Sequence, residues 1–361
     1  MLRVARFLTS FARTEKRELA EEVRLRTPSG DGEALLVRPR SGGVVPGWIV
    51  LHGITVPGRH HPVLRRFVHA LAASGAAVLV PDIPSWRRLR LDPTAADEAI
   101  RSSIEYLRSH PGIRPGPLNV LGFSFGGTHA LVSASKSGIR EHVGGVVAFG
   151  ALCDLARSTR FMFTGEHEWR GSRGRLDPDP YGRWIIAGNY LRLVPEFSHM
   201  SALTDAALRI AAEAGRVGIY AADPIYDEMK ARLRAELPTD ERVLWDVIAP
   251  PSDRRPDISA AADLAERIER AVAASDDPIV DPRAHFEGLD QRIVLAHGMD
   301  DLLIPFTEGF RLREALPETV DSRLYITRLY AHSARGNLSY ISYPTEIIRY
   351  LALLRNALAP C

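Results

Sequence analysis

Short apolar runs alternate with helix-length amphipathic stretches over much of the chain. The clearest apolar runs are 48–51, 77–80, 118–121 and 145–149. The segments between them place apolar residues three and four positions apart, which is the spacing of an amphipathic helix. Such alternation is typical of βαβ units, in which parallel strands are joined by helices that pack on the sheet. The pattern therefore predicts an α/β fold with a mostly parallel central sheet flanked by helices.

Turn and cap residues add detail to this expected order of elements. The first two strands, joined through Gly30, Asp31 and Gly32, form an antiparallel pair. Thr94, with Asp97 three residues later, resembles a capping box that begins a helix. The expected strands are 23–27, 34–38, 48–51, 77–80, 118–121, 145–149, 293–296 and 322–330. The expected helices between them are 62–74, 94–109, 125–137, 307–315 and 344–358.

The alternation stops after the sixth strand and resumes near residue 289. The intervening part contains Pro-rich loops and three clear helical patterns at 202–214, 224–237 and 258–274. We expect residues 1–150 and 289–361 to form one core, with 151–288 inserted as a mainly helical cap. Its large apolar residues, most of which we expect in its own core and a minority along a cleft, are Phe161, Met162, Phe163, Trp169, Trp184, Tyr190, Phe197 and Tyr220.

The start of the chain has the pattern of a helix, within a leading segment 1–20. We expect this helix to dock on the core, not on a membrane surface. Arg3 and Arg6 interrupt its apolar residues, so it is a poor secretion signal, and no stretch is apolar enough for an integral membrane span. The residues that share one helical face are Val4, Phe7, Leu8 and Phe11.

Charge and cysteine content exclude several classes of partner. The 46 basic and 44 acidic residues nearly cancel, so no strong field favours nucleic acid. Cys153 and Cys361 lie far apart, which fits a reducing, cytoplasmic location. The adjacent His60 and His61 point in different directions and lack a further ligand set, so we expect no metal and no cofactor.

A sharp turn between a strand and a helix carries the strongest chemical signal. Ser124 stands between Gly122 and Gly126, after an apolar strand and before a helix of small residues. This strand–turn–helix pattern holds a serine in a strained conformation and exposes its Oγ at the carboxyl edge of the sheet. Side chains at the two glycines would collide where strand and helix approach. The pattern predicts that Ser124 is a nucleophile, which needs a base and a carboxylate.

The downstream segment 293–305 contains His297-Gly298, then adjacent carboxylates, then Ile304-Pro305. Together with the Ser124 turn, these residues resemble the α/β-hydrolase family. The family's acid commonly lies in such a turn, and the match places it at Asp301, with Asp300 as the solvent-facing neighbour and His297 packed in the turn. Some members carry the acid after the sixth strand, so Asp154 stays an alternative. Asp82, at another strand end, is expected in a turn or helix-cap role.

The same resemblance implies a base and two oxyanion donors. His332, preceded by Ala331 where the family often has glycine, stands after the last strand, where the family places its base. The chain order Ser, Asp, His agrees. The N–H groups of Phe125 and Ile54 would form the oxyanion hole. His52 would organise the loop that carries Ile54, and Gly53 would allow that N–H to turn inward.

These residues predict a serine enzyme that cleaves a carboxylic ester of a small to medium, partly apolar molecule. Thioester or amide cleavage and acyl transfer would use the same Ser124, Asp301 and His332. A non-catalytic binding protein on the same fold is the alternative from a different class. The pattern does not set the physiological substrate or the oligomeric state.

Overall fold

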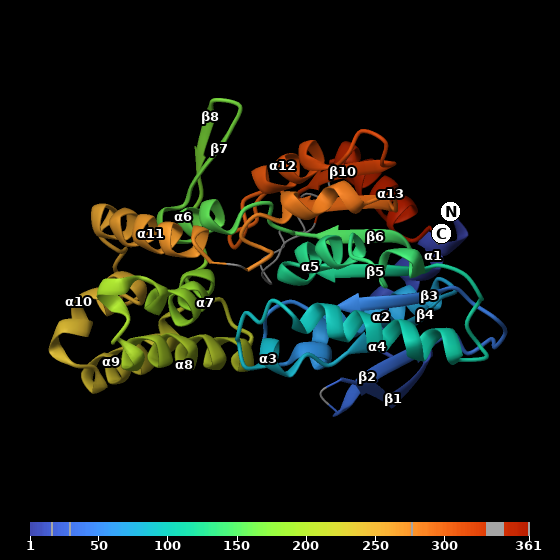
Figure 1. Ribbon diagram of the computed structural model, residues 1–361, viewed down its shortest axis with the longest axis horizontal. Helices are drawn as coiled ribbons and strands as arrows, with labels where there is room; N and C mark the ends of the chain where they lie inside the picture. The colour runs from blue at the N-terminus through green and yellow to red at the C-terminus, as the bar shows by residue number, and fades with distance from the viewer. Residues whose placement is uncertain (16, 29, 276, 330–342, 360–361) are drawn as a thin grey trace.

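The computed structural model describes the 361-residue chain except for residues 16, 29, 276, 330–342 and 360–361 (Figure 1). Its main feature is an eight-stranded sheet in the order β1-β2-β4-β3-β5-β6-β9-β10. Strands β1 and β2 pair antiparallel, as does β2 with β4, and the remaining neighbours are parallel. The strands are β1 (Leu19–Thr27), β2 (Gly30–Arg38), β3 (Gly47–Leu51), β4 (Ala77–Pro81), β5 (Leu118–Phe123), β6 (Val143–Phe149), β9 (Arg292–Gly298) and β10 (Ser322–Thr327).

Helices cover both faces of this sheet, which explains why its central strands are apolar on both sides. One face packs against α4, α5 and α12, and the other against α1, α2 and α13. Every residue of β3 and β4 is buried. These helices are α1 (Leu2–Ala12), α2 (Pro62–Ala73), α4 (Ala95–Ser109), α5 (Phe125–Ala134), α12 (Thr307–Ala315) and α13 (Pro344–Ala357), and the short α3 (Pro84–Arg87) follows β4.

The leading helix α1 packs on the sheet-covering helices α2 and α13. Val4 and Phe7 are buried there, and the ring of Phe7 meets that of Phe67 edge-on with centroids 5.3 Å apart. The prediction for Leu8 was wrong, because its side chain is 37% exposed. The contact stripe is centred on Phe7, so Leu8 lies at its edge.

The capping box expected at the start of α4 is also absent. Thr94 precedes the helix, but its hydroxyl donates to Asp92 Oδ1 at 2.9 Å. Asp97 turns instead towards α5, where it accepts from Ser133 Oγ and from Lys136 Nζ at 2.6 Å. Asp97 therefore forms an ion pair with Lys136 in place of a hydrogen bond that would cap its own helix.

The connection between β6 and β9, residues 150–291, forms an apolar core of its own. Figure 1 shows it beyond the ends towards which the arrows of β3 and β5 point. The prediction of helices is confirmed here, but the antiparallel pair β7–β8 was not foreseen, and a 3-10 turn, Pro224–Tyr226, precedes α9. The elements are α6 (Leu155–Thr164), β7 (Glu166–Trp169), β8 (Ser172–Arg175), α7 (Pro180–Tyr190), α8 (Ser201–Val217), α9 (Asp227–Glu236), α10 (Thr239–Ile248) and α11 (Ile258–Ala273).

Most of the large apolar residues singled out in this segment lie in that core. Trp184 and Phe161 are fully buried, whereas Trp169 is half-buried and stacks on Phe310 of α12 at 5.3 Å between ring centroids. No helix within the described residues is long and apolar enough to cross a bilayer.

Candidate active site

Ser124 has a backbone conformation that L-residues rarely adopt. Its φ of 57° and ψ of −128° lie in a strained region, at the point where β5 ends and α5 begins. The backbone holds it there, because Ser124 N donates to Phe149 O at 2.7 Å and Ser124 O accepts from Gly127 N at 2.8 Å. The serine therefore stands at the carboxyl edge of the sheet, as the sequence pattern predicts.

The two flanking glycines are required by space. A Cβ on Gly122 would lie 2.0 Å from Gly126 O, and a Cβ on Gly126 would lie 2.7 Å from His52 O. Both contacts are with backbone, which cannot move without opening the turn. The loop that follows β3 also approaches closely, since a Cβ on Gly53 would lie 3.5 Å from Ser124 Cβ.

Two backbone N–H groups near Ser124 find no acceptor among the described residues. Within the described part of the chain, nothing accepts a hydrogen bond from Phe125 N or from Ile54 N. Phe125 directly follows Ser124, and Ile54 directly follows Gly53, where an added Cβ would lie 3.5 Å from Ser124 Cβ. Unpaired N–H groups at such a position can stabilise negative charge on a bound oxygen. Gly53 itself is not in the left-handed region, so the expectation that it needs glycine's freedom to turn the Ile54 N–H was wrong.

The carbonyls of the loop 52–58 are held from several directions. Ile54 O accepts from the hydroxyl of Tyr181 at 3.0 Å. Thr55 O accepts from Gly58 N at 3.0 Å, and Val56 O accepts from Arg87 Nε at 3.2 Å. With its carbonyls fixed, the loop presents its remaining N–H groups in set directions.

His52 lies underneath this loop as a neutral group. Burial lowers its pKa to about 4, so it carries no charge at neutral pH. Its Nδ1 lies 2.7 Å from Gly53 O, to which it donates, and its ring meets Trp86 edge-on at 5.7 Å between centroids. A histidine that is buried and already hydrogen-bonded in this way supports the loop and is poorly placed to act as a base.

The predicted acid turn after β9 is compact and largely self-contained. The Asp301 side chain is fully buried, and its Oδ1 accepts from Leu303 N at 2.9 Å and from Ile304 N at 3.0 Å. His297 Nε2 donates to Ile304 O at 2.9 Å and lies 3.5 Å from Asp301 Oδ2. His297 is thus packed inside the turn. Asp300 is exposed and pairs with Arg328 at 3.4 Å.

Strand order sets the spacing between these groups. Ser124 follows β5 and Asp301 follows β9, with β6 between them. Two inter-strand spacings correspond to roughly 10 Å, a gap that one side chain between them can bridge. Asp154 follows β6, but its side chain caps α6 by accepting from Arg157 N at 2.9 Å. His332, predicted as the base, and Ala331 before it lie outside the described residues.

Comparisons with solved structures show the same architecture elsewhere. The structure is similar to acylaminoacyl peptidase from Pyrococcus horikoshii, with a TM-score of 0.52 and 11% identity over 96% of this chain and 41% of that one. It is also similar to an esterase of the fungus Rhizomucor miehei, with a TM-score of 0.50 and 16% identity over 98% of this chain and 88% of that one. The chain has the α/β-hydrolase fold. No family model matches it.

One curated relative of this α/β-hydrolase-fold chain is recognisable by sequence. It is a Bradyrhizobium protein described as a probable 2-oxo-3-(5-oxofuran-2-ylidene)propanoate lactonase, 28% identical over 128 residues. The match covers 31% of this chain and 49% of the relative. The chain therefore spans about half the length of the curated relative that it matches.

An ion-pair network behind the loop 52–58 was missed by sequence reasoning. The buried guanidinium of Arg59 pairs with Glu22 at 3.3 Å, with Glu33 at 2.6 Å and with Asp82 at 2.8 Å. Asp82 also pairs with Arg87 at 3.2 Å. Asp82 lies in the connection between β4 and α3, as expected, but it does not cap α3, because its nearly buried carboxylate is an ion-pair partner. No local signal marks Arg59 among so many arginines.

A fully buried carboxylate holds the start of the β6–β9 connection. Glu308, in the first turn of α12, accepts from Cys153 N and Asp154 N, each at 3.0 Å, and from Arg157 Nε at 2.7 Å. Burial also raises the pKa of the Cys153 thiol to about 12, which makes it a poor nucleophile. Among the described residues, no three His, Cys, Asp or Glu side chains gather where they could hold a metal.

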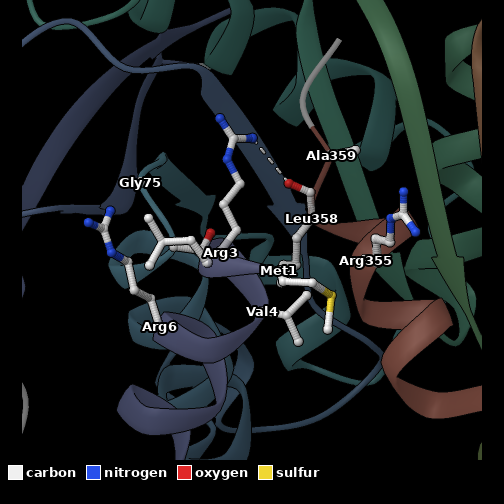
Figure 2. Close-up of a pocket in the computed structure, with 10 residues that line it drawn as sticks. Met1, Arg3, Val4, Arg6, Gly75, Arg355, Leu358 and Ala359 are labelled. Carbon is white, nitrogen blue, oxygen red and sulfur yellow. Dashed lines mark hydrogen bonds between the residues drawn. The ribbon is translucent and has the colours of Figure 1, made fainter. Parts of the chain in front are cut away.

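A pocket of about 480 Å³ lies far from Ser124 (Figure 2). It is lined by the start of α1, by Ser74 and Gly75, and by the end of α13. Arg3 Nη1 donates to Leu358 O at 3.4 Å along its wall. Ser74 and Gly75 immediately precede β4, so this pocket lies at the amino edge of the parallel strands, opposite the edge that carries Ser124.

Proposed function

We propose that the chain is a serine hydrolase that cleaves a carboxylic ester through an acyl-enzyme on Ser124. His332 would be the base and Asp301 the acid, and the N–H groups of Ile54 and Phe125 would bind the oxyanion. The observation that carries this proposal is the strained conformation of Ser124 between two sterically required glycines, beside two N–H groups that have no acceptor among the described residues. A merely structural serine has no need of that strain.

The proposed reaction proceeds in two matched halves. His332 takes the proton from Ser124 Oγ as the oxygen attacks the ester carbonyl carbon. The carbonyl oxygen becomes negative and accepts from Ile54 N–H and Phe125 N–H, each worth roughly 3 kcal/mol of transition-state stabilisation. His332 then returns the proton to the leaving alkoxide. Water repeats the sequence on the acyl-enzyme and releases the acid and free Ser124.

The surroundings of the two carboxylates favour Asp301 over Asp154 as the acid. Asp301 is buried at the end of β9, and two backbone N–H groups fix one of its oxygens. Fixed and buried, it can orient an imidazole and stabilise its protonated form. Asp154 is partly exposed and already caps α6 and pairs with Arg157 at 3.5 Å.

Residues 151–288 act in this proposal as a cap over the site. Ile54 and Leu303, from the loops on either side of Ser124, pack against the apolar core of that segment together with Phe125. Met162 and Ile185 of the segment belong to the same cluster. An apolar cap of this kind over Ser124 would favour a small to medium, partly apolar acyl or alcohol group.

The comparisons support an ester over an amide as the cleaved bond, although the same catalytic residues could cleave either. A lactone is an internal ester, and the sequence relative is described as a lactonase. The acylaminoacyl peptidase shares only the fold, so amide or thioester cleavage and acyl transfer are the alternatives. A non-catalytic binding protein is the alternative from another class.

The test challenges the protein with a fluorophosphonate and with p-nitrophenyl esters and lactones of graded chain length. The wild type should be labelled at Ser124, as intact and peptide mass spectrometry would show, and should turn over at least one ester. Ser124→Ala and His332→Ala should abolish turnover. Ser137→Ala, an exposed serine elsewhere on the core, is the matched control and should leave it unchanged. Full activity in Ser124→Ala would refute the proposal.

A further inference from the structure

The first turn of α7 touches both loops that flank Ser124. Asp179 N donates to Leu302 O in the acid turn at 2.9 Å. Two residues later, the hydroxyl of Tyr181 donates to Ile54 O at 3.0 Å. A Cβ on Gly182 would lie 3.3 Å from Leu303 Cδ2, which confirms how closely this turn packs on the acid turn. A single helical turn of the β6–β9 connection therefore joins the two loops.

The helix begins at a well-defined place. Asp179 is buried and accepts from Tyr181 N at 3.0 Å, and Pro180 occupies the first helical position. A side-chain cap followed by proline fixes the start of a helix and the direction of its first residues. The Tyr181 ring is thereby aimed with little freedom.

The Tyr181 hydroxyl is a neutral hydrogen-bond donor. Burial raises the pKa of this hydroxyl above its ordinary range, while a hydrogen bond with Thr55 acts in the opposite direction. A phenol that stays protonated throughout the working pH range keeps its O–H on Ile54 O. Gly215 of α8 packs on the same stretch, where an added Cβ would lie 3.6 Å from Val56 Cγ2.

The bond matters because of which carbonyl it holds. The next two carbonyl oxygens of the loop, on Thr55 and Val56, accept hydrogen bonds from Gly58 N and Arg87 Nε of the sheet domain. Within the described residues, Ile54 O is bonded only by Tyr181. The Ile54 N–H lies in the same rigid peptide plane as Gly53 O, which His52 Nδ1 holds at 2.7 Å. The Tyr181 bond fixes the peptide plane on the other side of Ile54, so the two bonds together restrict rotation about the Ile54 backbone and the direction of its N–H. An oxyanion donor stabilises the transition state less when it can rotate away from the position that the oxyanion will occupy.

We propose that Tyr181 is a positioning residue that aims the Ile54 N–H at the oxyanion, a role that rests on the proposed function. Tyr181 acts through Ile54 and does not touch the reacting atoms. The segment 151–288 thus completes the catalytic loop as well as covering it. The Tyr181 bond stabilises the transition state, in which the oxyanion exists, and contributes little to the binding of substrate.

The experiment compares Tyr181→Phe with Tyr226→Phe. Tyr226 Oη donates to Ile219 O at 2.9 Å, so the control deletes the same kind of bond from the same segment at a distance from Ser124. Tyr181→Phe should lower kcat for a p-nitrophenyl ester about 10- to 100-fold, less than deleting an oxyanion donor outright, with KM within about 3-fold. Tyr226→Phe should keep kcat within about 2-fold.

Two further measurements separate positioning from general support. A trifluoromethyl ketone, whose adduct with Ser124 carries an oxyanion, should lose affinity for Tyr181→Phe by the same factor as kcat/KM falls. Placing 4-aminophenylalanine at residue 181, which restores a donor, should recover most of kcat. Rates are normalised to the folded fraction measured by circular dichroism, so a less stable variant remains informative.

The outcomes distinguish this inference from the proposed function. If Ser124→Ala abolishes turnover but Tyr181→Phe keeps kcat, changes only KM, or is matched by Tyr226→Phe, the positioning role is wrong and the hydrolase stands. If Ser124→Ala keeps turnover, the proposed function itself fails. A loss of kcat without loss of affinity for the ketone also overturns the positioning role.

Discussion

The acid turn and the oxyanion loop flank the same serine but are built in opposite ways. The acid turn is held mainly by bonds between close neighbours in the chain, with Asp301 two and three residues from its donors and His297 seven from its acceptor. A bond from the start of α7 joins Asp179 N to the backbone oxygen of Leu302. The loop 52–58 depends on remote groups, among them Tyr181, 127 positions from Ile54. A locally built turn tolerates change elsewhere, whereas the loop should respond to substitutions far from it.

The largest effect is expected at the turn between the two loops. In Gly122→Ala, the new Cβ would meet Gly126 O at 2.0 Å and Gly126 C at 2.3 Å, which only backbone movement can relieve. We expect a loss of more than about 4 kcal/mol in the free energy of unfolding, or no folded protein at all. Gly53→Ala is the matched control, because its Cβ would make only ordinary contacts, and should change stability by less than about 1 kcal/mol. Urea denaturation measures both.

The acid turn should lose catalysis and keep its structure in Asp301→Asn. The amide oxygen can still accept from Leu303 N and Ile304 N, but the negative charge that would orient and stabilise His332 is gone. We expect kcat to fall by about 10³- to 10⁴-fold. Asp300→Asn, at the exposed neighbour, should stay within about 3-fold. A large loss confined to Asp154→Asn would move the acid to the end of β6.

Arg59→Met should destabilise the loop 52–58 by removing the ion pairs that support it. This change leaves the nearly buried Asp82 with Arg87 alone and removes both bridges to β1 and β2. We expect about 3 kcal/mol less stability in urea denaturation, together with lower kcat. The control Arg24→Met breaks an exposed pair with Asp31 and should cost less than about 0.5 kcal/mol. Equal costs for the two variants would argue against a supporting network.

An effect of similar size, but seen only at acidic pH, is expected from the buried His129 of α5. Burial lowers its pKa from 6.5 to about 4, so below pH 6.5 the unfolded chain binds a proton that the folded chain does not. The contribution of His129 to the free energy of unfolding is therefore fully present above pH 6.5. It falls by roughly 3 kcal/mol as the pH drops towards 4. His129→Gln should flatten the pH dependence of unfolding between pH 6.5 and 4. An unchanged slope would show that His129 titrates normally, and His60→Gln, at an exposed site, is the control.

The contrast between the loops also explains what the sequence could predict. The strand and helix segments, the Ser124 turn and the Asp301 turn each follow from residues within a few positions of one another. Tyr181 was missed although Asp179 and Pro180 form a recognisable helix start, because nothing local shows which loop that helix meets. Arg59 and Asp82 were missed or misassigned for the same reason: ion pairs between distant strands leave no periodic signature. The position of His332 stays a prediction.

The place where the β6–β9 connection leaves and rejoins the sheet has a consequence for evolution and engineering. Strands β6 and β9 are neighbours, and Gly150 N even donates to Ala296 O at 2.8 Å, so the excursion of residues 150–291 begins and ends at adjacent points. A different module could be exchanged there without re-threading the sheet. Any replacement, however, would have to bring its own donor for Ile54 O, which makes this junction permissive in topology and selective in chemistry.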